Sequence, residues 1–131
     1  MKYDNLIVKA IEAREKAYVP YSHFKVGAAL ITEDDSIYTG CNIENCSYGA
    51  TNCAERTAIF KAVSEGYRKI KAIAIVGDEK NYTAPCGICR QVISEFADKD
   101  IDIIIVKDKD NYKIKKMNEI LPDSFTKDNL L

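Results

Sequence analysis

The chain has 131 residues, of which 47% are hydrophobic and 30% charged, with 19 basic and 20 acidic side chains. This length suits a single domain, residues 1–131, with a core of its own. The near-neutral balance argues against a polynucleotide binder, which usually has a strong basic excess, and leaves small ligands open. Because no long apolar run occurs and the N-terminal segment is charged throughout, we expect no membrane span and no secretory signal.

Hydrophobic periodicity and turn residues predict an alternation of helices and strands. In chain order these are a helix over 3–17, strands over 25–32 and 36–44, a helix over 52–65, a strand over 70–77, a helix over 86–97, strands over 101–107 and 112–117, and a short helical turn before an irregular tail. The order αββαβαββ predicts an α/β fold, a layered sandwich in which helices cover a mixed five-stranded sheet.

The two apolar strands, 70–77 and 101–107, read as buried on both faces, as parallel neighbours usually are. If they are parallel, the helices that precede them can begin at the same edge of the sheet. Cysteines stand at both predicted helix starts, in the segments TNCAE and PCGIC. The sequence therefore predicts that these cysteines meet.

These cysteines have the spacing of a metal site. Cys86 and Cys89 are three residues apart, so both sulfurs can reach one ion, and Cys53 would supply a third. The positive end of a helix lowers thiol pKa values and so favours thiolate ligands. Side chains in a first turn lean toward the N-terminus, so Glu55 can approach an ion beyond the helix end.

Other interpretations remain open at this point. Asn52 and Glu55 have the spacing of a capping box. Cys46 could close a four-cysteine structural zinc site, although Cys41 and Cys46 are expected to be buried small side chains. His23, the single histidine, is expected to face solvent or pack rather than bind metal. An odd set of five cysteines favours metal binding or burial over disulfides, and hence a cytoplasmic protein.

Taken together, a C-x-E motif followed about thirty residues later by P-C-x-x-C is the signature of zinc-dependent deaminases. The segments YVPYSHFKVGAAL, GCNIENCSYGATNCAERTAI, PCGICRQVISEF and LPDSF resemble the cytidine and deoxycytidylate deaminase family, in particular its small homotetrameric nucleoside deaminases. The resemblance implies a three-layer α/β/α fold, one Zn²⁺ per subunit, a nucleoside substrate and self-association to a homotetramer.

The resemblance also implies roles for individual residues. Cys53, Cys86 and Cys89 would bind zinc, and Glu55 would be the catalytic proton shuttle. Arg56 would withdraw charge from the sulfurs, the alternative being a solvent-facing arginine, and Gln91 would add a hydrogen bond. The substrate contacts implied are Asn42 and Glu44 to the ribose, Ile43 between them, Phe24 on the pyrimidine, the backbone at Ala54 to the base, and Tyr48 and Phe125 from neighbouring subunits.

The implied activity is hydrolytic deamination of cytidine and deoxycytidine, as in pyrimidine salvage. Two alternatives stay open. A blasticidin-S-type deaminase has similar motifs, although the NIEN and YSHF segments favour a simple nucleoside. A structural-zinc module would bind the metal without any catalysis.

Overall fold

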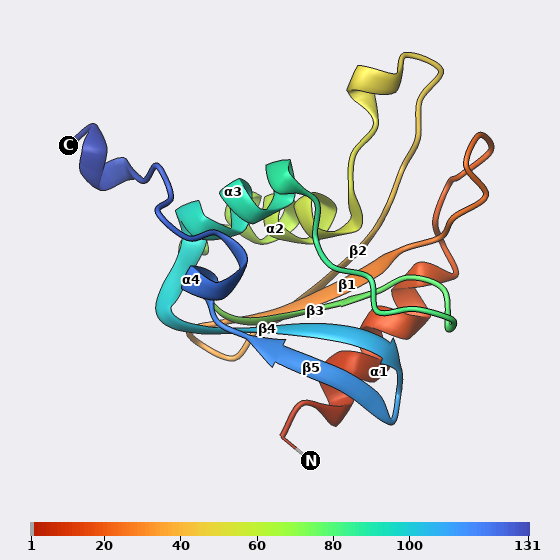
Figure 1. Ribbon diagram of the computed structural model, residues 1–131, viewed down its shortest axis with the longest axis horizontal. Helices are drawn as coiled ribbons and strands as arrows, with labels where there is room; N and C mark the ends of the chain where they lie inside the picture. Colours follow the sequence, from red (N-terminus) through yellow and green to blue (C-terminus); the bar gives the residue numbers. More distant parts are fainter. Residues whose placement is uncertain (1) are drawn as a thin grey trace.

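The computed structural model describes residues 2–131, which form a five-stranded sheet flanked by helices (Figure 1). The elements are α1 (Asp4–Arg14), β1 (Gly27–Thr32), β2 (Ile37–Cys41), the 3₁₀ turn η1 (Tyr48–Ala50), α2 (Ala54–Ser64), β3 (Ile70–Val76), α3 (Gly87–Phe96), β4 (Ala97–Asp108), β5 (Asn111–Lys115), α4 (Met117–Ile120) and the 3₁₀ turn η2 (Lys127–Asn129). None of these helices has the length and apolar character needed to cross a membrane.

The sheet is mixed, and its strand order is β2-β1-β3-β4-β5. β1 is antiparallel to both β2 and β3, β3 is parallel to β4, and β5 closes the sheet antiparallel to β4. The parallel pair is the one expected from the two apolar strands, with Ile73 opposite Ile103. The predicted mixed five-stranded sheet is therefore confirmed.

Alternate residues of the central strands enter two separate cores, which makes the fold a three-layer α/β/α sandwich. Ala72, Ala74 and Val76 of β3 pack with α1 on one face of the sheet. Ile73 and Ile75 pack with α2 and α3 on the other face. Figure 1 shows α1 alone on one side of the sheet and α2, α3 and α4 on the other. Since β3 and β4 are covered on both faces, their nearly continuous apolar sequences are explained.

The predicted element boundaries differ from the observed ones by at most four residues. The first helix ends at Arg14, because the chain then turns to bridge Tyr18 to Ile43 beside the sheet. β4 begins at Ala97, directly after α3, because Ala97 pairs with Ile70 across a register irregularity. The η1 turn was not expected, since its residues carry no apolar period. These differences leave the predicted order of elements intact.

Gly40 allows β2 and α2 to approach closely. A Cβ atom at position 40 would lie 2.5 Å from the backbone N of Ala58 and 2.6 Å from the carbonyl O of Ala54. Backbone atoms cannot rotate away, so any larger residue would push the helix off the strand. The close contact also sets the position of the first turn of α2, where Ala54 lies.

We predict that Gly40→Ala lowers the free energy of unfolding by about 3 kcal/mol, near the upper end for overpacking, because the new methyl group meets helix backbone. Urea unfolding of the metal-free protein measures this loss. Gly49→Ala is the matched control, since a Cβ there has no heavy atom within 4 Å. Equal stability of the two variants would contradict the close-packing argument.

Candidate metal centre

Two helix N-termini meet at the candidate site. Cys53 is the N-cap residue of α2, and Cys86 is the N-cap residue of α3. The backbone N–H of Cys89 donates to Cys86 Sγ at 3.5 Å, so the second helix is capped by a sulfur. Both helices thus direct their N-terminal N–H groups and a positive partial charge toward the sulfurs, which stabilises thiolates.

The sulfurs of Cys53, Cys86 and Cys89 lie within 4.8 Å of one another. The Sγ atoms of Cys53 and Cys86 are 3.7 Å apart. Tetrahedral zinc with Zn–S bonds of about 2.3 Å requires sulfurs about 3.8 Å apart, so the donor set fits Zn²⁺. Three protein ligands leave a fourth position open, the arrangement of catalytic rather than structural zinc sites.

The other cysteines stay outside this cluster. Cys46 is exposed and its thiol lies 3.8 Å from Asn45 Oδ1, while Cys41 is half-buried. The expectation that Cys46 is buried is wrong, because it lies in the exposed loop between β2 and α2. Within residues 2–131, the structure therefore gives no support to a four-cysteine site. His23 is exposed, as expected, and does not join the cluster.

Positive charge reaches the sulfurs from Arg56. Its Nη2 donates to Cys53 Sγ at 3.3 Å, while its buried Nε has no hydrogen-bond partner among residues 2–131. Hydrogen bonds from Cys89 and then Arg56 lower the pKa of the Cys53 thiol to about 5. The hydrogen bond to Cys53, together with burial, raises the pKa of Cys89. In the metal-free protein, negative charge is thus concentrated on Cys53, beside the guanidinium.

Glu55 is a buried carboxyl next to this charge. It is 3% exposed, and burial, with a contribution from the Cys53 thiolate, raises its pKa to about 7. The capping-box interpretation is wrong: Cys53, not Asn52, is the N-cap, and the amide of Asn52 donates to the hydroxyl of Thr57. A carboxyl that exchanges protons near neutral pH is suited to general acid–base chemistry.

Two polar side chains at the end of β2 hold the segment that carries Phe24. The Asn42 amide donates to the carbonyl of Phe24 at 2.8 Å and accepts from Val26 N at 2.9 Å. Glu44 accepts from the backbone of Tyr21 at 3.0 Å. These hydrogen bonds attach the aromatic residue to the NIE segment, where Ile43 is 45% exposed.

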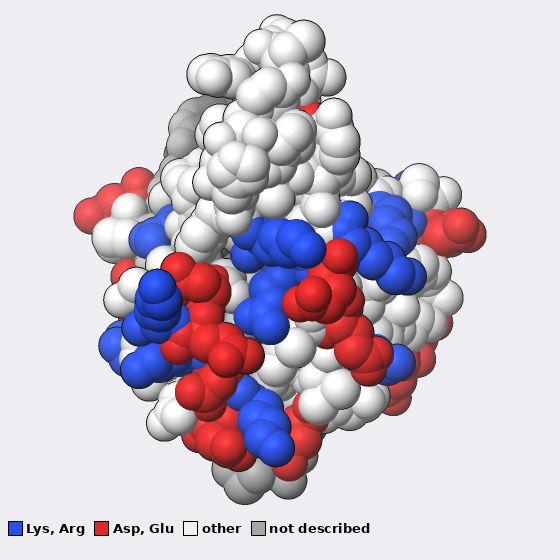
Figure 2. Space-filling model, turned by 90° about the vertical axis from the view of Figure 1, so that its right-hand side faces the viewer, with Lys and Arg blue, Asp and Glu red and all other residues white. Residues whose placement is uncertain are grey.

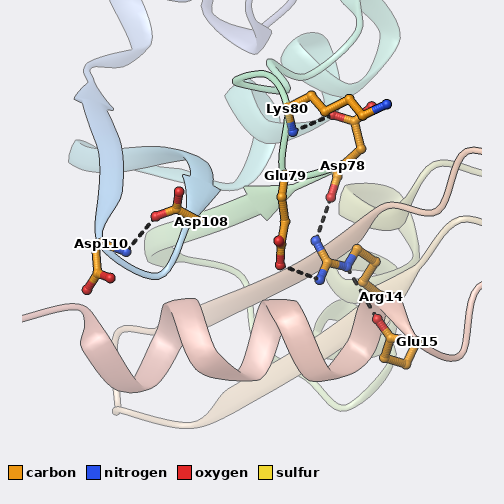
Figure 3. Close-up of polar contacts among 8 residues, drawn as sticks. Arg14, Glu15, Asp78, Glu79, Lys80, Asp108 and Asp110 are labelled. Atoms are coloured by element: carbon orange, nitrogen blue, oxygen red, sulfur yellow. Dashed lines mark hydrogen bonds and ion pairs between the residues drawn. The ribbon is translucent and has the colours of Figure 1, made fainter.

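The ring of Phe24 lies against Gly77 at the end of β3. A Cβ atom at position 77 would come 2.8 Å from Phe24 Cζ and would also clash with Thr83. Arg14, at the end of α1, donates to the carbonyl of Gly77 at 2.6 Å, and Figure 3 shows its ion pairs with Glu15 and Glu79. Arg14 therefore anchors the strand end on which the aromatic ring rests.

The residues expected at subunit contacts are exposed. Tyr48 is 77% and Phe125 60% exposed. Tyr48 belongs to a loop that projects from the molecule and looks uncharged in Figure 2, since residues 45–52 carry no charge. The C-terminal segment leaves the molecule on the opposite side of Figure 1 from the loop that carries Phe24. Within the single chain, the structure does not bring Phe125 to the thiol cluster.

Gln91 is also not brought to the cluster: its amide donates to the carbonyl of Phe125 at 2.8 Å and so holds the C-terminal segment.

The sequence analysis assigned no role to Arg90, whose Nε donates to the carbonyl of Pro85 at 2.8 Å and steadies the residue before Cys86. Arg14 and Ser22 were missed as well, because their partners lie far along the chain. A search of the sequence for metal-binding histidines and cysteines cannot find such residues, because they bind no metal and act through hydrogen bonds to other elements.

The comparisons with known proteins agree with this geometry. The family model described as the cytidine and deoxycytidylate deaminase zinc-binding region matches residues 1–105. A protein of Sporosarcina psychrophila named cytidine deaminase is 50% identical over 130 residues, covering 99% of this chain and 96% of the relative. One of Halalkalibacterium halodurans with the same name is 51% identical over 125 residues, covering 95% of each.

Solved structures agree as well. The crystal structure of cytidine deaminase from Burkholderia pseudomallei superposes with a TM-score of 0.89 at 47% identity, covering 95% of this chain and 100% of the other. That of Mycobacterium tuberculosis gives a TM-score of 0.84 at 37% identity, covering 95% and 98%. Fold and thiol cluster are thus those of zinc-dependent deaminases. The chain belongs to the cytidine and deoxycytidylate deaminase family and carries its zinc-binding region.

The raised pKa of Glu55 predicts that the free energy of unfolding of the metal-free protein depends on pH. Between the ordinary value of 4.5 and about 7, the folded state binds more protons than the unfolded state. Stability therefore falls as pH rises through this window. Glu55→Gln removes the charge, so its stability relative to wild type should increase by roughly 3 kcal/mol between about pH 4 and about pH 8. Urea unfolding with a chelator and a reductant measures both proteins; a difference independent of pH would contradict the burial argument.

Proposed function

We propose that this chain catalyses the hydrolytic deamination of cytidine and deoxycytidine to uridine and deoxyuridine, with release of ammonia. The observation that carries the proposal is the buried carboxyl of Glu55, which titrates near neutral pH beside three thiols with the spacing of a zinc site. The relatives named cytidine deaminase, about half identical over nearly the whole chain, support this substrate class.

Cys53, Cys86 and Cys89 would hold one zinc ion in each subunit. When bound, zinc supplies a Lewis acid that lowers the pKa of water toward about 7. Three thiolates carry more negative charge than Zn²⁺ carries positive charge, which would weaken that acidity. Arg56, which donates to Cys53 Sγ, and the two helix N-termini offset the excess charge. Arg56 is thus a tuning residue rather than a solvent-facing one.

Glu55 would move the protons of the reaction. It accepts a proton from the attacking water and delivers it to N3 of the pyrimidine ring, which makes C4 electrophilic. It would then carry the second proton of that water, from the new hydroxyl on C4, to the departing amine, so that the C4–N bond breaks and leaves a carbonyl at C4 and ammonia. Burial among α2 residues keeps the carboxyl in one place, so a single side chain serves both steps. Its pKa near 7 lets it both accept and release protons at neutral pH.

The nucleoside would lie between the thiol cluster and the Phe24 loop. The backbone N–H of Ala54, in the first turn of α2 where N–H groups have no intrahelical acceptor, would bind the base, and the ring of Phe24 would pack on it. Asn42 and Glu44 would bind the ribose hydroxyls, with Ile43 between them. The Asn42 amide has two N–H groups, and within residues 2–131 only one of them donates to the chain, at the carbonyl of Phe24, which leaves the other for a hydroxyl.

The activity test follows the ultraviolet absorbance of cytidine, deoxycytidine and blasticidin S, together with zinc analysis. We expect turnover of the first two. Glu55→Gln should keep its zinc while kcat falls by about a thousandfold or more, because the proton shuttle is lost. Glu65→Gln, at the exposed end of α2, is the matched control. If the protein turned over blasticidin S but neither nucleoside, it would be a blasticidin-S-type deaminase. If it bound zinc tightly but turned over none of the three compounds, it would be a structural-zinc module.

We further propose that residues 1–131 act as a single domain within a homotetramer in the cytoplasm. Tyr48 and Phe125 are exposed on projecting segments and would complete the sites of neighbouring subunits. A site open to solvent in one chain needs such cover to exclude water from the base. The free thiols of the proposed zinc site require a reducing compartment, which supports the cytoplasm.

Sedimentation at equilibrium should give four times the chain mass of 14.7 kDa. Phe125→Ala should raise KM for cytidine roughly five- to tenfold at unchanged assembly, because an aromatic contact is lost. Leu131→Ala, at a residue 96% exposed, is the control and should leave KM unchanged. A fully active monomer would contradict the proposed sharing of sites.

A further inference from the structure

Ser22 joins the proposed sugar-binding carboxylate to the proposed base-stacking ring. The Ser22 hydroxyl donates to Glu44 Oε2, and Ser22 Oγ itself accepts from the backbone N–H of Phe24 at 3.0 Å. The backbone N–H groups of Tyr21 and Ser22 donate to Glu44 Oε1 at 3.0 and 3.1 Å. The whole turn before Phe24 is therefore organised around one carboxylate.

Both backbone groups of Phe24 depend on side chains from the NIE segment. The N–H is held by Ser22, which is held by Glu44, and the C=O is held directly by Asn42 at 2.8 Å. Asn42 and Glu44 are also the two residues proposed to bind the ribose. A shift of either side chain on binding a sugar would thus be transmitted to the aromatic ring.

The turn is strained, so it needs these hydrogen bonds. His23, between Ser22 and Phe24, has φ of 59°, in the left-handed region that costs a non-glycine residue about 1 kcal/mol. Its backbone N–H donates to the carbonyl of Val19 at 3.0 Å. The strained conformation persists only while the surrounding contacts outweigh its cost. Removing the Ser22 hydroxyl takes away two of them.

Glu44 also has capacity for one more donor. A carboxylate offers about four acceptor positions. Three are taken by Tyr21 N, Ser22 N and the Ser22 hydroxyl. The remaining position lies on the oxygen that Ser22 orients, so a sugar hydroxyl bound there would share Oε2 with Ser22.

We propose that Ser22 is a positioning residue that couples recognition of a sugar hydroxyl at Glu44 to packing of the base on Phe24. The inference rests on the proposed function, because it takes the ligand to be a nucleoside. The chemistry requires a hydroxyl at this place, since one group must donate to the carboxylate and accept from the backbone at the same time. Alanine does neither, and threonine does both.

The first measurement needs no substrate. In Ser22→Ala the amide of Phe24 loses its acceptor and should exchange its hydrogen at least several-fold faster. The amide of Val26, which Asn42 holds at 2.9 Å, should change little. Unchanged exchange at Phe24 would overturn the structural half of the inference, whatever the protein turns over.

The second measurement compares cytidine with 2′,3′-dideoxycytidine, which lacks the 2′- and 3′-hydroxyls of the ribose but keeps the 5′-hydroxyl. Ser22→Ala should raise KM for cytidine about tenfold, equivalent to a hydrogen-bond contribution of the usual size, with kcat within about twofold. For the dideoxy nucleoside the same substitution should raise KM only about two- to threefold, because the coupled contact is already missing. Ser22→Thr should restore the KM for cytidine.

Ser64→Ala is the matched control, since this exposed serine donates to the carbonyl of Lys61 at the far end of α2. It should leave kcat and KM unchanged. An equal rise in KM for both nucleosides, or wild-type KM in Ser22→Ala, would overturn the coupling while leaving the proposed activity in place. Failure of the wild-type protein to deaminate cytidine would instead overturn the proposed function, and with it the nucleoside part of this inference.

Discussion

The close approach of three sulfurs, with negative charge concentrated on that of Cys53, is the constraint around which the rest of the structure is arranged. Cys53, Cys86 and Cys89 lie within 4.8 Å of one another, a spacing that is unfavourable for thiolates without positive charge nearby. The N-termini of α2 and α3 and the guanidinium of Arg56 supply that charge. The two helix ends meet because both helices pack on one face of the sheet, ahead of the parallel strands β3 and β4.

The same arrangement raises the pKa of Glu55. One turn of α2 brings Cys53 as the N-cap and Glu55 two residues later, and packing of that turn on the sheet buries the carboxyl. Burial raises its pKa to about 7, a cost to stability that suits the proton transfer proposed for this carboxyl at neutral pH. Gly40 contributes indirectly, since its lack of a side chain lets α2 lie against β2. Close packing and acid–base chemistry thus have one structural cause.

The proposed nucleoside end of the site depends on different forces. Phe24 is held by exposed hydrogen bonds from Ser22 and Asn42 and by contact with Gly77, which Arg14 anchors (Figure 3). Such contacts are weaker than those of the core, so this loop can respond to a ligand while the thiol cluster stays in place. The projecting uncharged loop in Figure 2 suits burial against another surface, as the proposed tetramer requires.

The sequence alone determined the order of elements, the mixed sheet and the pairing of TNCAE with PCGIC, because apolar periodicity and cysteine spacing are local signals. It could not exclude Cys46 as a ligand or Glu55 as a cap, since both depend on where a helix begins and which loop is exposed. Only the tertiary structure decided that Cys53 caps α2, that Gln91 holds the C-terminal segment, and that Ser22 links Glu44 to Phe24. These contacts join residues from separate elements, and burial and hydrogen bonding between such residues exist only after the chain has folded.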